Sequence, residues 1–135
     1  MDEMTLHVPV NVKAVLTTAL RSQLKLEMED AIRNVELELQ QLEFQAKRMI
    51  AEQQKTDPQL LPQLYNYLDS ERSKRLEFKK VTEDKLERLE KLELGSEITN
   101  GTIDRSITVK LGDDLIKYMG AEILLEDGKI IAFRM

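Results

Sequence analysis

Between residues 10 and 94 the chain contains no glycine, and the only prolines in that stretch are Pro58 and Pro62. Glycine and proline are the residues that most disfavour the interior of a helix. The stretch therefore predicts two long helices, over about residues 17–54 and 62–94, with one short break between them. Such a segment folds either as one bent rod or as a helical hairpin.

The first of these helices has a regular apolar repeat. Apolar residues follow one another at alternating steps of four and three, and they are Met28, Ile32, Val35, Leu39, Leu42, Ala46 and Met49. A repeat of 3.5 residues is typical of a helix that packs along the length of a partner helix. The second helix has a looser pattern, in which we expect Phe78 to face Val35.

The distribution of charge favours the hairpin over the rod. Residues 27–43 hold six acids and one arginine, whereas residues 72–80 hold five bases and one glutamate. If the chain turns near Asp57, residues whose numbers add up to about 114 lie opposite each other, and the acidic block then meets the basic block. We expect a tip at residues 54–62, in which Asp57 caps the turn and Pro62 begins the second helix.

Both ends of the chain predict β-strands. Val8, Val10 and Val12 alternate with polar residues, and residues 103–111 alternate in the same way. Pro9 has no backbone N–H and favours an edge position for the first strand. Asp127-Gly128 is a preferred pair for a tight hairpin turn.

Two shorter features complete the C-terminal segment. Asp113 is expected to cap a helical turn that ends at Gly120, and Gly95 is expected to end the second long helix. The predicted fold is therefore α+β: a long antiparallel coiled-coil hairpin, residues 17–94, inserted into a small antiparallel β domain of four or five strands, residues 1–16 and 95–135.

Composition excludes several kinds of chemistry. The chain has no cysteine and one histidine, His7, so a thiolate, disulfide or transition-metal site is not expected. The net charge of −5 disfavours direct attraction to nucleic acid or to anionic membranes. No signal peptide or membrane span is visible. We expect a cytoplasmic protein with no catalytic residues and no cofactor, which is not an enzyme.

Two apolar surfaces are candidate contact sites. At the tip, an exposed end holds Leu60, Leu61, Tyr65 and Tyr67. These residues serve as a partner contact or simply close the end of the hairpin. On the first helix, a second apolar stripe faces away from the predicted partner helix, and it consists of Leu26, Leu37, Phe44 and Ala51. This stripe predicts self-association of the arm, in the simplest case as a dimer with four helices.

Acidic and basic side chains offer two alternatives. The bases of residues 72–80 suit contact with RNA phosphates, but the hairpin supplies them with opposing acids. Asp57 and Glu52 at the tip are reminiscent of the paired acids that hold Mg²⁺ in transcript-cleavage factors, although no second acid lies in the loop. Asp113 and Asp114 form another acidic pair, better explained as the cap of a helical turn.

Three short stretches carry a family resemblance: "LGSEITNG", "VKLGDDL" and "ILLEDGKII". With the valine-rich first strand and the charged helical pair, the chain resembles the YlqD family of small bacterial proteins over nearly its whole length. The resemblance implies no catalytic residue, cofactor or substrate. Because genes of this family tend to lie among genes for ribosome maturation and tRNA modification, it implies an association with RNA or ribosome biology.

The leading hypothesis for function is a non-enzymatic interaction or scaffold protein that acts through the coiled-coil arm. The first alternative is an RNA- or ribosome-associated factor that uses the basic face of the second helix. A weaker alternative is a Mg²⁺-dependent, transcript-cleaving factor that uses acids at the tip.

Overall fold

The computed structural model describes residues 2–135, which form two compact units. The hairpin unit comprises residues 23–91, and the sheet unit comprises residues 2–22 and 92–135. The fold is α+β, as predicted, with a long helical hairpin and a sheet built from the two ends of the chain.

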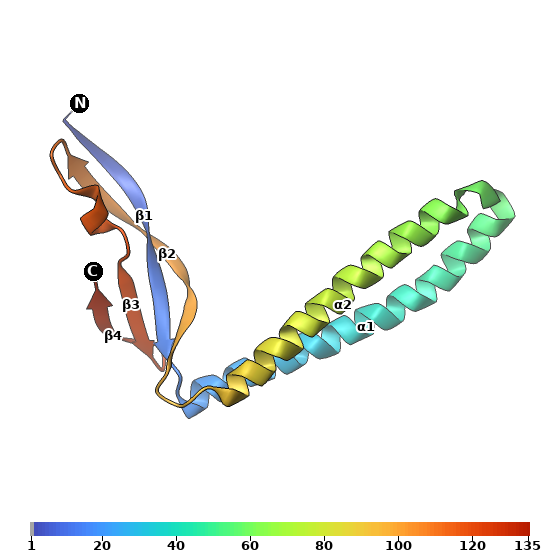
Figure 1. Ribbon diagram of the computed structural model, residues 1–135, viewed down its shortest axis with the longest axis horizontal. Helices are drawn as coiled ribbons and strands as arrows, with labels where there is room; N and C mark the ends of the chain where they lie inside the picture. The colour runs from blue at the N-terminus through green and yellow to red at the C-terminus, as the bar shows by residue number, and fades with distance from the viewer. Residues whose placement is uncertain (1) are drawn as a thin grey trace. The chain divides into compact units, whose positions relative to one another are not determined.

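Two long helices make up the hairpin. Helix α1 spans Thr18–Thr56 and α2 spans Leu61–Lys91, and Figure 1 shows α2 folding back along α1. Thr17 begins α1 by accepting a hydrogen bond at Oγ1 from the backbone N–H of Leu20, 3.1 Å away. The absence of glycine and proline from both helix interiors explains why each continues for so many turns.

The turn between the helices has the predicted chemistry. The 3-10 helix η1 spans Pro58–Leu60, and the Asp57 side chain caps it by accepting from the backbone N–H of Gln59. Pro58 occupies the first turn of η1, where a missing N–H is harmless. Pro62 is the second residue of α2, so the helix starts one residue before the predicted position.

Ion pairs between the helices confirm the predicted register. Glu43 pairs with Arg72 at 2.6 Å, Glu38 with Arg75 at 3.6 Å and Glu36 with Lys79 at 3.4 Å. Nearer the open end, Lys25 pairs with Glu90. The residue numbers of each pair add up to 113 or 115, so the acidic block of α1 does lie along the basic block of α2.

The buried side of α1 follows the predicted repeat, with Val35, Leu42 and Ala46 buried. The buried side of α2 differs from the apolar pattern of its sequence. Its fully buried residues are Leu68, Thr82 and Leu89, and the half-buried Arg75 occupies the position between the first two. Leu68, Arg75, Thr82 and Leu89 are seven residues apart, so they form the line of α2 residues that faces α1. This contact line of α2 includes two polar residues, Arg75 and Thr82. Phe78 lies beside that line and is 50% exposed.

Four strands form one sheet, in the order β2-β1-β3-β4. Their bounds are Glu3–Val15 for β1, Glu97–Lys110 for β2, Glu122–Glu126 for β3 and Lys129–Arg134 for β4. The β1–β2 and β3–β4 pairs are antiparallel, but β1 and β3 are parallel. Residues 111–121 return the chain to the other side of β1 before β3 begins, which lets β3 run in the same direction as β1 (Figure 1).

The position of Pro9 differs from the prediction. Strand β1 lies inside the sheet rather than at its edge, but β3 pairs only with residues 11–14. Asn11 donates its backbone N–H to Ala121 on that side, at 2.9 Å. Backbone groups two residues apart point the same way. Pro9 therefore lies in a part of β1 that β3 does not pair with, and its missing N–H leaves no gap in the β1–β3 hydrogen bonds.

Three turns show where local patterns were correct and where they were not. Asp127 and Gly128 have φ values of 49° and 84° between β3 and β4, as a type I′ turn requires. Asp114, not Asp113, caps the short helix η2 at Leu115–Tyr118. Asp113 instead accepts from the backbone N–H of Lys110, because the chain turns there. Helix α2 ends at Lys91, so Gly95 lies in the connection to β2 and does not end the helix.

Candidate interaction surfaces

The outer stripe of α1 is the set Leu26, Leu37, Phe44 and Ala51. The first three side chains are 57%, 56% and 66% exposed, and Ala51 is exposed as well. Successive helical residues are rotated by about 100°, which places the stripe roughly opposite the buried Leu42 and Ala46. The hairpin thus uses one side of α1 for α2 and leaves a second apolar side open.

Phe44 is the most exposed of the three large side chains of the outer stripe. With Leu39, Gln40, Glu43 and Lys47 it lines a shallow hollow of about 400 Å³ on α1. Apolar side chains that line up along an open helix face are typical of helix–helix contact surfaces.

The tip residues lie in two environments. Leu60, Tyr65 and Tyr67 are 43–55% exposed, whereas Leu61 is half-buried. Just behind the tip, Leu42, Ala46 and Leu68 form a small core against which Ile50 and Leu64 pack. The end of the hairpin is therefore closed mainly by Ile50 and Leu64, and two tyrosines and Leu60 are left on the surface.

Ion pairs occupy most of the basic block of α2. Arg72 contacts Asp69 as well as Glu43, and the hydrogen bond to Glu43 raises the pKa of the Arg72 guanidinium. Arg75 and Lys74 both contact Glu71, at 2.9 and 3.3 Å. The hydrogen bond from Arg75, followed by that from Lys74, lowers the pKa of the Glu71 carboxyl. These bases face protein carboxylates, which leaves a weaker field for phosphate.

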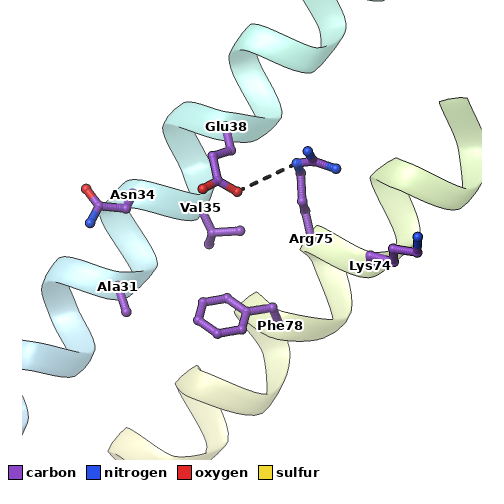
Figure 2. A pocket seen from close by; sticks show the side chains of 7 residues that line it. All are labelled: Ala31, Asn34, Val35, Glu38, Lys74, Arg75 and Phe78. Carbon is purple, nitrogen blue, oxygen red and sulfur yellow. Dashed lines mark ion pairs between the residues drawn. The ribbon is translucent and has the colours of Figure 1, made fainter.

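A hollow of about 440 Å³ opens on one flank of the hairpin, and Figure 2 shows the side chains around it. Val35 and Phe78 project toward it from opposite helices, and the Glu38–Arg75 ion pair lies at one end. Ala31, Asn34 and Lys74 complete the lining. At this level the contact line of α2 is occupied by Arg75, and Phe78 lies beside it.

The candidate acids have local structural partners. Asp57 caps η1, and Asp113 and Asp114 each accept a backbone N–H. His7 lies within 3.3 Å of the Ser106 hydroxyl on the exposed face of β1 and β2. Within residues 2–135, no group of three histidine, aspartate or glutamate side chains lies close enough together to hold a metal ion.

Comparison with known proteins agrees with this fold and with the motifs noted in the sequence. The family model described as "YlqD protein" matches residues 4–134. The chain belongs to the YlqD family. The YlqD relative of Bacillus subtilis (strain 168), described as "Uncharacterized protein YlqD", is 29% identical over 126 residues, which cover 93% of this chain and 94% of the relative.

A solved structure shares the YlqD fold. A protein of unknown function from Synechococcus sp. WH 8102 superposes with a TM-score of 0.89, over 98% of this chain and 95% of the other. The sequences are 24% identical, so this comparison bears on the fold alone. Across residues 2–135 of the present YlqD-family chain, no helix has the length and apolar character needed to cross a membrane.

Sequence patterns did not reveal the flank hollow or the open surface of strand β4. The spacing of apolar residues predicted that Phe78 contacts α1. Only the seven-residue spacing of Leu68, Arg75 and Thr82 could have shown that Phe78 lies beside the contact.

On β4, Ile130, Ile131 and Phe133 are 50–74% exposed. The "KIIAFR" pattern predicted this strand of the YlqD fold but carried no signal for its exposure.

Proposed function

We propose that the protein is a non-enzymatic interaction or scaffold protein that acts through its helical hairpin. The single observation that carries this proposal is the outer stripe of α1, whose large side chains remain more than half exposed on the side opposite α2. An apolar stripe of this length is costly to leave in water, because burial contributes about 25 cal/mol per Å² of apolar surface. A contact that covers the stripe would remove that cost.

The arrangement of polar groups supports an interaction role over the alternatives. Four of the five bases that an RNA-binding role would need are engaged with Glu36, Glu38, Glu43 and Glu71. The tip acid that a cleavage role would need caps a turn through Asp57. The tip residues Leu60, Leu61, Tyr65 and Tyr67 remain a second proposed contact surface, beyond the end of the hairpin core.

A capture experiment with variants tests the proposal. Tagged wild-type protein and a Leu37→Glu/Phe44→Glu variant would be purified from the protein's own cells, and the bound proteins identified by mass spectrometry. A Leu76→Glu/Val81→Glu variant is the matched control, because it places two charges on half-exposed apolar positions of α2. We expect the stripe variant to lose partners that the wild type and the control retain.

The same experiment can overturn the proposal. If the stripe variant retains every partner of the wild type, with its helix content unchanged by circular dichroism, the stripe is not the interaction surface. A Leu60→Ser/Tyr67→Ser variant tests the tip in parallel. Loss of partners only in that variant would move the interaction site from the outer stripe to the tip.

A further inference from the structure

We propose that the outer stripe of α1 binds the same stripe of a second copy, with the two α1 helices antiparallel and related by a two-fold axis near residues 38 and 39. This inference rests on the proposed interaction function and names the partner. In the proposed register, facing residues have numbers that add up to 77. Leu26 then faces Ala51 of the second copy, and Leu37 faces Gln40 of the second copy.

The spacing of the stripe suits such a contact. The face consists of two lines of residues seven apart: Leu26, Arg33, Gln40 and Lys47 on one line, and Asp30, Leu37, Phe44 and Ala51 on the other. In an antiparallel pair of helices, each line faces the other line of the partner helix. Leu37 enters the space between Leu37, Gln40 and Phe44 of the second copy. Leu37 of both copies therefore lies beside the two-fold axis.

Charge complementarity selects the antiparallel direction. Within the stripe, Asp30 lies toward the start of α1 and Lys47 toward its end. In the proposed register, Asp30 faces Lys47 of the second copy. The two-fold axis repeats this pair, which gives two attractions. A parallel arrangement would instead place like charges together, which opposes pairing.

Only part of this charge is free for contacts between copies, because Asp30 already forms an ion pair with Arg33 in its own helix. In the described part of the chain, residues 2–135, Glu29, Lys47 and Arg48 form no ion pair with an opposite charge. This contrasts with the inner flank of α1, where Glu36, Glu38 and Glu43 are each paired with a base of α2.

Charge reversal provides a direct test. A Glu29→Lys/Asp30→Lys variant and a Lys47→Glu/Arg48→Glu variant would each be studied by analytical ultracentrifugation over a range of concentrations. Each variant alone sets like charges against each other at the two contacts between residues 30 and 47, and we expect its dimer dissociation constant to rise by about tenfold or more. Mixing the two variants restores both attractions, so the mixture should form heterodimers with an affinity near that of the wild-type dimer.

A control variant and a cysteine cross-link distinguish the proposed contact from a general effect of net charge. The Glu77→Lys/Asp84→Lys variant changes the net charge by the same amount on exposed positions of α2, and its dissociation constant should stay near that of the wild type. Because the chain has no cysteine, Leu37→Cys and Gln40→Cys each introduce a unique thiol, and these two positions face each other across the proposed axis. An oxidised mixture of the two variants should form a mixed disulfide between copies, whereas a mixture of Leu37→Cys with Gln45→Cys, on another side of α1, should not.

Two outcomes overturn the inference in different ways. If the wild type is monomeric at every concentration measured, a second copy is not the partner. The proposed interaction function is then tested by the capture experiment alone. If the wild type dimerises but neither charge reversal weakens it and their mixture forms no heterodimer, the copies associate through another face or register. That result would leave self-association intact and remove the antiparallel α1 contact.

Discussion

The contact line of α2 gives the sharpest prediction about stability. Leu68 and Leu76 are leucines in the same helix, but Leu68 is 2% exposed and Leu76 is 48% exposed. Replacing either leucine with alanine changes helix propensity by nearly the same small amount. The difference between Leu68→Ala and Leu76→Ala therefore reports packing against α1.

The expected magnitudes follow from burial. Deleting a buried leucine side chain costs about 2–5 kcal/mol of unfolding free energy. For Leu68→Ala we expect about 3 kcal/mol, toward the lower half of that range, because a hairpin one helix pair thick can partly collapse around the lost volume. For Leu76→Ala we expect less than about 1 kcal/mol, since half of its side chain is already in water.

Urea denaturation followed by circular dichroism at 222 nm measures both variants, because the long helices dominate that signal. Wild type and variants must be compared at one protein concentration, since self-association would add stability by mass action. The slope with urea should be unchanged, so that a shift in midpoint reports stability. A cost for Leu76→Ala equal to or above that for Leu68→Ala would show that the contact line of α2 runs elsewhere.

Two further predictions concern charge on the hairpin. Hydrogen bonds from Arg75 and Lys74 lower the pKa of Glu71, so its contribution to stability is present above the ordinary glutamate pKa of about 4.3 and is lost as the pH falls through the lowered value. The melting temperature of Glu71→Gln should therefore lie below that of the wild type at pH 7, and the gap should shrink as the pH falls below the ordinary glutamate pKa. A gap that stays constant as the pH falls through this region would contradict the role given to the carboxylate. Replacing Arg72, Arg75 and Lys79 together with glutamine should lower the melting temperature of the helices at pH 7, because three ion pairs to α1 are lost. If that variant instead kept its stability and lost salt-sensitive binding to RNA in a filter assay, the bases would serve a partner rather than the fold.

Local sequence patterns were enough to predict the main elements. The helices follow from a long stretch without glycine, and the turn follows from Asp57 and Pro58. The type I′ turn at Asp127-Gly128 follows from the residues that tolerate positive φ. The register of the hairpin could also be predicted, because it depends on matching two blocks of charge along one axis.

Other features were decided by tertiary contacts. Which line of α2 meets α1 depends on the geometry of both helices, and packing placed Arg75 and Thr82 on that line in spite of their polarity. From there Arg75 forms ion pairs with Glu38 and Glu71, although its Nε atom is buried without a hydrogen bond. Thr82 donates its hydroxyl to the carbonyl of Phe78. The apolar pattern of the α2 sequence could not show which residues contact α1, because a polar group that has partners can also occupy a contact position.

The exposure of candidate sites also depended on the tertiary structure. From the sequence alone, Leu37 and Phe44 were predicted to face away from α2, because helical periodicity fixes the angle between two stripes on one helix. Their exposed fractions, the flank hollow beside Phe78 and the parallel pairing of β1 with β3 were decided only by the folded chain. Periodicity along an element is a local property of the backbone, whereas the neighbour that covers each face is set by parts of the chain far away in the sequence.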